Sequence, residues 1–183
     1  SEKLMTSKIL IPFDETECAQ NTVTYVAKNL NKEDEVTLFH VVPDTAAACG
    51  LNSPSLTPYF EAERNSFCRM EEKREKMMRD SLETARYKLI DAGFAKEKVH
   101  IKTQPQGKKI SDDIIHEAQK GKYKTVAMGR SSTSGLKEFF IGSNASRVMH
   151  SLNIPVIIVD WKKEWKDYAP PEFSRTNDLQ PNW

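Results

Sequence analysis

The sequence predicts an α/β domain built on a five-stranded, mostly parallel open sheet with helices on both faces. Short aliphatic runs alternate with stretches of helical periodicity between residues 8 and 160. Alternation of this kind is typical of a parallel sheet in which each crossover helix packs back onto one face. The chain has 183 residues, which is enough for one sizeable core and too few for two comfortable domains.

Five runs rich in β-branched and aliphatic residues predict the strands. They span residues 8–12, 35–42, 99–103, 125–129 and 155–160. Apolar residues at spacings of three and four predict helices over residues 16–30, 59–92, 108–120 and 142–152. Residues 44–58 have no clear period and are rich in Ala, Ser and Pro, so we expect a loop or a lid there.

The long charged helix has two unlike halves. Its second half carries a regular apolar stripe, whereas the first half has only Phe60, Phe67 and Met70 as apolar anchors. We therefore expect the first half to be bent, frayed or held by a partner. Gly93 follows the last periodic residue and is suited to end the helix.

The two ends of the chain lack the alternating strand and helix patterns of this domain. Residues 1–7 lack the apolar stretch of a signal peptide, and we interpret them as a short leader. Residues 161–183 form a C-terminal extension with three Trp, three Pro and no sustained period. Because large aromatic side chains are unfavourable in water, we expect the part through Phe173 to pack against its own subunit or a second one.

Composition argues against several classes of partner. Lys and Arg total 27 against 26 for Asp and Glu, so no net charge favours nucleic acid or an anionic membrane surface. No apolar run approaches the roughly 20 residues of a membrane span. The three cysteines, Cys18, Cys49 and Cys68, match no metal-binding spacing, and we interpret them as free thiols in a reducing cytoplasm. The four histidines are scattered, with no metal-binding spacing.

The segment from Met128 to Asn144 carries the chemistry. Gly129 ends a predicted strand, and Gly142 opens a predicted helix. A helix start presents unpaired N–H groups and the positive end of the helix dipole, so it accepts phosphate readily. Gly142 leaves room for a phosphate, and the hydroxyl of Ser143 can donate a hydrogen bond to it. The same residues are also ordinary turn chemistry, so on their own they leave both readings open.

This segment resembles the signature of the universal stress protein family, in which Gly, two residues, Gly, nine residues, Gly and then Ser or Thr follow the fourth strand. Gly129, Ser132, Gly142 and Ser143 hold that spacing. The opening K-I-L-I-P-F-D, the run F-H-V-V-P and the run P-V-I-I-V resemble other family motifs in the right order. The resemblance covers residues 8–160 and implies a single-domain member with a Rossmann-like, adenine-nucleotide alpha-hydrolase-like sheet.

The resemblance implies a site for ATP or a related adenine nucleotide, with Mg²⁺ as a possible companion. It places Asp14 near the ribose or a phosphate-bound metal, although a helix N-cap is the alternative role for that carboxylate. By the same resemblance, the remaining site residues border the adenine (Pro12, Phe13 and Val41), line the ribose and first phosphate (Met128 and Gly129), and hold the outer phosphates (Ser132, Gly142, Ser143 and Asn144). We predict no catalytic residue.

Two positions depart from the family pattern. Ser132 stands where the family often has Gly, which puts a Cβ in the loop that wraps the phosphates. Glu15-Thr16 follows Asp14 where the family often has Gly-Ser, which adds a negative charge near a triphosphate.

The leading functional hypothesis is a nucleotide-binding stress or regulatory protein of the cytoplasm. Hydrolysis of ATP would at most be weak, because the chain has no dedicated base and no P-loop Lys motif. The alternative is a nucleotide-independent, dimeric interaction module of the same fold. The family resemblance suggests a homodimer in which the last strand, Pro155 through Asp160, pairs antiparallel with its copy. A nucleotidyl transferase on a similar sheet is disfavoured, because no His follows the first strand.

Overall fold

The computed structural model describes residues 6–43, 58–130 and 141–160, and within them it contains one five-stranded sheet whose pairings are all parallel. The strand order is β3-β2-β1-β4-β5. The strands are β1 (Lys8–Pro12), β2 (Glu35–Val42), β3 (Val99–Pro105), β4 (Thr125–Gly129) and β5 (Val156–Val159). The α-helices are α1 (Glu17–Asn29), α2 (Pro58–Asp91), α3 (Ile110–Lys120) and α4 (Ser143–Ser151), and a short 3-10 turn, Lys96–Lys98, precedes β3.

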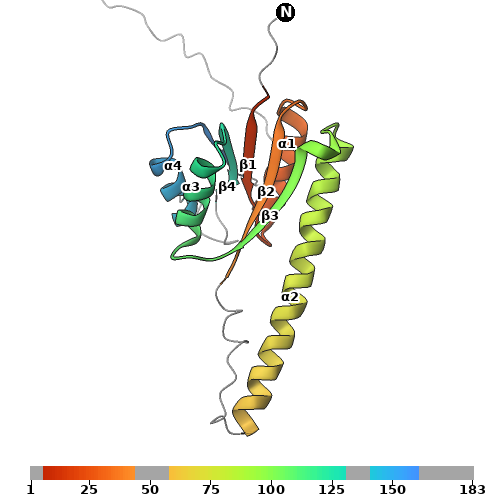
Figure 1. Ribbon diagram of the computed structural model, residues 1–183, viewed down its shortest axis with the longest axis vertical. Coiled ribbons are helices and arrows are strands. Elements are labelled where there is room, and N and C mark those ends of the chain that lie inside the picture. Colours follow the sequence, from red (N-terminus) through yellow and green to blue (C-terminus); the bar gives the residue numbers. More distant parts are fainter. Residues whose placement is uncertain (1–5, 44–57, 131–140, 161–183) are drawn as a thin grey trace, which may run out of the picture.

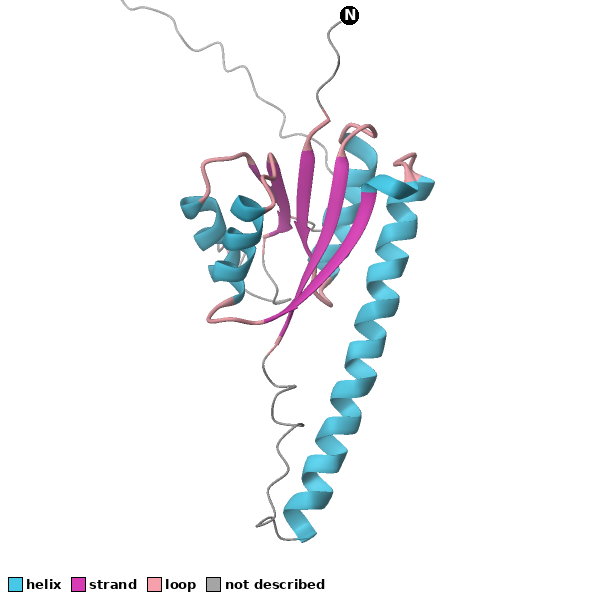
Figure 2. Ribbon diagram, in the orientation of Figure 1, coloured by secondary structure: helices cyan, strands magenta, loops and turns pink. Residues whose placement is uncertain are grey.

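Helices cover both faces of the sheet, as the sequence predicts. Figures 1 and 2 show α3 and α4 on one face and α1 and α2 on the other. The side chains of the central strand β1 alternate between the two faces of the sheet. Ile9 and Ile11 belong to the core cluster under α1 and α2, and Leu10 belongs to the cluster under α3 and α4. A strand buried on both faces reads as a continuous apolar run, which is why β1 was recognisable from sequence.

The predicted boundaries hold where a local signal marks them. Thr16 is the N-cap of α1, and its hydroxyl accepts a hydrogen bond from the Ala19 N–H at 3.3 Å. Gly93 has a φ of 108°. The N–H of Gly93 donates to Ile90 O, and that of Phe94 donates to Leu89 O, which together cap the last turn of α2. The strand β3 extends to Pro105, two residues past the prediction, because it keeps its pairing with β2 to that point.

The long helix α2 is continuous over both predicted halves. Its second half packs through Met78, Leu82, Ala85 and Leu89, all buried, whereas its first half projects beyond the sheet (Figure 1). Phe67 and Met70 on the first half are 39% and 66% exposed. None of the helices in the described part of the chain is long and apolar enough to cross a membrane.

The cysteines differ from one another. Cys18 is a free thiol, but Cys68 on α2 is disulfide-bonded. The interpretation of the cysteines as free thiols is therefore wrong for Cys68, because spacing along the sequence does not reveal which thiols the fold brings together. Cys49, residues 44–57 of the expected loop, residues 131–140 of the signature segment and the C-terminal extension lie outside the described residues. Residue 58, the last of the expected loop, instead begins α2.

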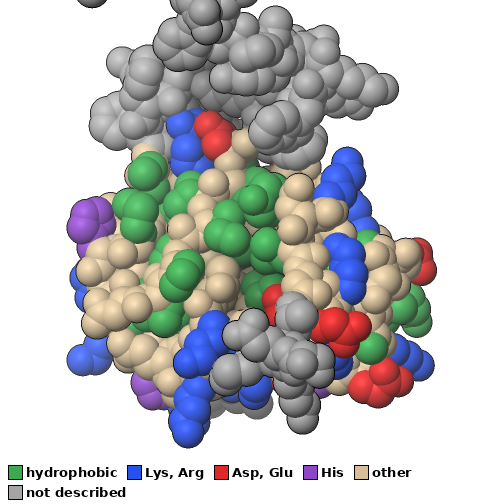
Figure 3. Space-filling model, turned by 90° about the horizontal axis from the view of Figure 1, so that it is seen from above, with side chains coloured by type: hydrophobic (Ala, Val, Ile, Leu, Met, Phe, Trp, Pro, Cys, Tyr) green, Lys and Arg blue, Asp and Glu red, His purple; other side chains and the backbone are tan. Residues whose placement is uncertain are grey.

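Charged side chains of both signs are interspersed with apolar ones on the face seen in Figure 3. That face is viewed from above Figure 1, where the chain enters β1. The described residues form no broad field of one sign there, in keeping with the balance of 27 basic and 26 acidic residues.

A buried polar cluster ties α3 to the sheet. Glu117 on α3 is 4% exposed and accepts hydrogen bonds from Lys102 Nζ at 2.6 Å and from Tyr123 OH at 3.3 Å. Burial raises the pKa of Tyr123 above its usual value of 10.0, and the charge of Glu117 adds to the rise against an opposing hydrogen bond with Thr37. The folded protein therefore holds the phenolic proton more tightly than the unfolded chain.

Tyr123 should make the protein lose stability as pH rises above 10. Below pH 10 both states keep the phenol protonated, whereas above it the unfolded chain releases the proton first and is favoured. We expect the free energy of unfolding to fall less steeply between about pH 9 and pH 11 in Tyr123→Phe than in wild type. Urea unfolding at several pH values measures both slopes, and equal slopes would contradict the prediction.

Gly129 is required by the packing of α1 on β4. A Cβ placed on Gly129 would lie 2.6 Å from the Cβ of Cys18 and 3.2 Å from its carbonyl carbon. Gly129→Ala should therefore destabilise the protein by about 1–3 kcal/mol, as overpacking does. Urea denaturation measures this. Cys18→Ala keeps the colliding Cβ and should not rescue Gly129→Ala, while Cys18→Gly should rescue part of the loss. A Gly129→Ala protein as stable as wild type would rule out the packing constraint.

Candidate functional site

The carboxyl ends of β1, β2 and β4 meet at one cavity of about 670 Å³. The strand order reverses between β1 and β4, because the chain moves outward from β1 to β2 and β3 on one side and from β4 to β5 on the other. Ligands of open α/β sheets bind in the crevice outside the strand ends at such a point. The cavity also lies within the usual volume range of small-molecule sites, roughly 300–1,000 Å³.

Nine of the ten predicted site residues line this cavity, and the tenth, Ser132, lies outside the described residues. The nine are Pro12, Phe13, Asp14, Val41, Met128, Gly129, Gly142, Ser143 and Asn144. They come from three strand ends and one helix start, so the fold brings together segments that are more than 120 residues apart in sequence. Their roles toward a ligand stay predictions.

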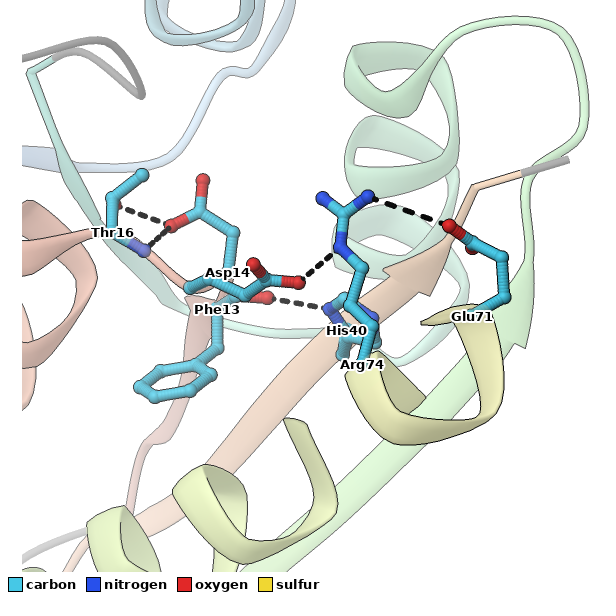
Figure 4. Close-up of polar contacts among 7 residues, drawn as sticks. Phe13, Asp14, Thr16, His40, Glu71 and Arg74 are labelled. Atoms are coloured by element: carbon cyan, nitrogen blue, oxygen red, sulfur yellow. Dashed lines mark hydrogen bonds and ion pairs between the residues drawn. The ribbon is translucent and has the colours of Figure 1, made fainter. Parts of the chain in front are cut away.

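Asp14 supports the start of α1 rather than capping it directly. One of its oxygens, Oδ1, accepts a hydrogen bond from the Thr16 N–H at 2.9 Å and another from the Thr16 hydroxyl (Figure 4). Thr16 in turn is the N-cap, so the alternative role suggested for Asp14 belongs to its neighbour. Asp14 is half-buried at the cavity wall, and its second oxygen is the atom that could accept from a ligand hydroxyl.

The peptide groups of Phe13 are held from both sides. Its N–H donates to Phe39 O at 2.8 Å, which continues the pairing of β1 with β2. Its carbonyl oxygen lies 2.9 Å from His40 Nδ1, and because a carbonyl only accepts, Nδ1 is the donor (Figure 4). Phe13 and Val41 are themselves buried. These contacts hold in place the wall that the family resemblance assigns to the adenine. Because the Phe13 N–H already donates to Phe39 O, it cannot also donate a hydrogen bond to a base.

The start of α4 supplies donors to the cavity. Gly142 is the N-cap residue and has no side-chain cap, and its own N–H donates to Arg130 O at 2.8 Å. The N–H groups of the first turn, at Ser143 and Asn144, have no partner within the helix by its geometry. They point where the helix dipole is positive, so an anion is favoured there. Gly142 thus contributes space and a fixed chain path rather than its own N–H.

Arg130 closes this side of the cavity. It follows β4, and its Nε lies 3.2 Å from Asp160 Oδ1 at the end of β5. Arg130 lines the cavity beside Gly129 and Gly142. The sequence gives no signal that pairs Arg130 with Asp160, because nothing local shows that β5 returns next to it.

The sequence reasoning missed the wall that α2 contributes. Glu71, Arg74, Glu75, Met78, Arg79 and Leu82 all line the cavity. Their spacing continues the buried stripe of α2 toward its first half, which is the signal that could have revealed them. Arg74 Nε donates to Glu15 Oε1 at 2.6 Å, and its Nη1 lies 3.9 Å from Glu71 Oε1. The hydrogen bond with Glu15 raises the pKa of Arg74 above its usual value.

The described side chains form no group of three His, Cys, Asp or Glu residues placed to hold a metal ion.

Comparison with solved structures shows the same fold. One neighbour is a hypothetical protein whose biochemical function was assigned from its structure, with a TM-score of 0.62, 24% identity and coverage of 88% of this chain and 100% of that one. A universal stress protein from Archaeoglobus fulgidus, solved in complex with dAMP, has a TM-score of 0.53, 15% identity and coverage of 85% and 98%. A universal stress protein in complex with cAMP has a TM-score of 0.54, 12% identity and coverage of 84% and 96%.

Among curated proteins, none matches the chain at a significant level. The model of one protein family, described as the universal stress protein family, matches residues 5–160, which is most of the chain. This match shows that the chain belongs to the universal stress protein family.

Proposed function

We propose that this protein binds an adenine nucleotide in the cavity at the ends of β1, β2 and β4, as a regulatory or stress-response protein of the cytoplasm. The observation that carries the proposal is the cavity itself, which joins a strand-order reversal to the start of α4. Two structural neighbours in the same family were solved with cAMP and dAMP. ATP is the nucleotide that the resemblance of the signature segment implies.

The residues present fit such a ligand. Phe13 and Val41 offer an apolar wall for a base, and Asp14 offers a carboxylate oxygen for a ribose hydroxyl. The first turn of α4 offers N–H groups to a phosphate. A bound Mg²⁺ would supply positive charge against the phosphates, and Asp14 is the carboxylate that could share it.

Regulation fits these residues better than fast hydrolysis does. Fast hydrolysis of ATP takes a dedicated base or a P-loop Lys motif, and the sequence carries neither. Binding would instead change the contacts at the strand ends and at α2. We therefore assign the protein at most a weak ATPase activity.

Gly142→Val should abolish nucleotide binding, because two added methyl groups would fill the space in front of the first turn of α4. Calorimetric titration of ATP, AMP and cAMP into the wild type at fixed Mg²⁺ should give a measurable dissociation constant, and Gly142→Val should show no heat of binding. Ser151→Val at the other end of α4 is the matched control and should bind as wild type does. Absorbance of the purified protein adds a test for a co-purified nucleotide.

A wild type that binds none of these ligands at millimolar concentration would overturn the proposal. The nucleotide-independent interaction module would then be the better description, and Glu15 at the cavity mouth would be its physical basis, because its charge opposes a phosphate.

We also propose that the protein is a homodimer formed through β5. This strand lies at the sheet edge and pairs only with β4 among the described strands. The carbonyls of Pro155 and Val159 accept from β4, so the alternating Ile158 directs its N–H and C=O to the open edge. Open edges of this kind invite pairing, and an antiparallel pairing of two copies satisfies two-fold symmetry.

Light scattering of the wild type should give twice the chain mass of 20.9 kDa. Ile158→Pro removes an N–H that β4 does not use, so it should shift the protein to a monomer while far-ultraviolet circular dichroism stays unchanged. A wild-type monomer at micromolar concentration would disprove the dimer.

A further inference from the structure

The mouth of the cavity carries an ion pair that links two distant parts of the chain. Glu15 follows β1, and Arg74 lies 59 residues later on α2. Arg74 Nε and Glu15 Oε1 are 2.6 Å apart, and both residues line the cavity. Figure 4 shows Arg74 extending from α2 toward the segment of Phe13 and Asp14.

Acidic side chains crowd this mouth. Among the described residues, four carboxylates line the cavity (Asp14, Glu15, Glu71 and Glu75), together with three guanidinium groups (Arg74, Arg79 and Arg130). Arg130 already lies against Asp160 at 3.2 Å, and Arg74 lies between Glu15 and Glu71. These carboxylates repel a phosphate that enters the mouth unless cations balance their charge. Arg74 is the cation that is bonded to Glu15 after β1.

Stability does not account for this pair. The side chains of Arg74 and Glu15 are 54% and 48% exposed, and ion pairs with that exposure contribute little to folding. Arg74 also lies at the point where α2 leaves the sheet, one turn before the first buried residue of its stripe, Met78. The pair is thus better placed to set the charge of the cavity than to hold the helix.

We propose that Arg74 is a specificity residue that neutralises Glu15 and so lets the cavity accept a phosphate-bearing nucleotide rather than an uncharged nucleoside. The inference rests on the proposed adenine-nucleotide binding and adds the basis of its preference for charge. Arg74 acts through Glu15, so it is a positioning and charge-balancing residue and has no catalytic role. Without Arg74, the negative charge of Glu15 is no longer balanced by this cation and repels the incoming phosphates.

A double-mutant cycle tests this inference. Arg74→Met keeps much of the aliphatic stem and removes the charge, and Glu15→Gln removes the carboxylate charge. Calorimetry with adenosine, AMP and ATP is run on the wild type, both single variants and the double variant. Lys88→Met, which removes one positive charge from α2 where its ammonium bonds Thr24 outside the cavity, is the matched control.

Arg74→Met should weaken ATP binding about tenfold, equivalent to about 1.4 kcal/mol, while adenosine binding stays within about twofold of wild type. The double variant should return to within about twofold of the wild-type affinity for ATP, because the repelling charge is gone. The loss in Arg74→Met should shrink when salt rises from about 20 mM to about 300 mM, since the Debye length shortens. Lys88→Met should bind every ligand as the wild type does.

Four results would overturn the inference. If Arg74→Met binds ATP as the wild type does, Arg74 has no such role, and the proposed nucleotide site still stands. If the double variant stays as weak as Arg74→Met, Arg74 acts on the ligand itself or on the fold. If adenosine binding falls as much as ATP binding, the role is structural. If the wild type binds no adenine ligand, the proposed function fails and this inference fails with it.

Discussion

The burial of β1 on both faces is the constraint from which the rest of the structure follows. Ile9, Leu10 and Ile11 are at most 2% exposed, so helices have to cover the sheet on either side of this strand. Parallel neighbours β2 and β4 then flank β1, and the chain leaves it in opposite directions to build the two halves of the sheet. The helices that follow β1 and β4, α1 and α4, consequently lie on opposite faces of the sheet, and the cavity lies at the strand ends where the strand order reverses.

The sequence predicts those parts of the fold whose cause is local. The limits of β1, β2 and β4 were predicted because apolar runs end at Pro, charged or Gly residues, and Gly93 was predicted because a helix end commonly needs a positive φ. The limits of β3 depended on pairing with β2, which local pattern does not show. The fold class was predictable for the same reason as the strands, since alternation is a property of the whole pattern and tolerates errors at single boundaries.

The candidate site was predictable as a set of strand ends and much less so as a set of contacts. The residues that follow β1, β2 and β4 converge because carboxyl ends of parallel strands share one edge. The contact partners of these residues were not predictable. The contact of Phe13 with His40 joins residues 27 positions apart, and that of Glu15 with Arg74 joins residues 59 positions apart. No periodicity relates such pairs, and only the packing of α2 against the sheet brings the second one together. The disulfide at Cys68 was missed for a similar reason.

The two glycines of the signature segment show why a motif alone does not establish a ligand. Gly129 has to be Gly because Cys18 of α1 occupies the place of its Cβ, whether or not a nucleotide binds. The N–H of Gly142 donates to Arg130 O and is not free to bind a phosphate. What Gly142 contributes to such a site is the absence of a side chain before α4, next to the N–H groups of the first helical turn. A relative that keeps both glycines could therefore keep the fold and lose the ligand. What separates these outcomes is the charge around the cavity, which neither glycine sets.

The charge around the cavity is in part supplied by α2, and this connects the site to the half of α2 that projects beyond the sheet. The buried stripe of α2 begins at Met78, and the turns before it carry Glu71, Arg74 and Glu75 in the cavity lining and Phe67 and Met70 in exposed positions outside it. A ligand shifts a protein between states only by the difference in its interactions with them. A phosphate at the cavity mouth interacts with the charges of α2 and of the β1 end together, so its binding energy depends on how these two segments are held relative to each other.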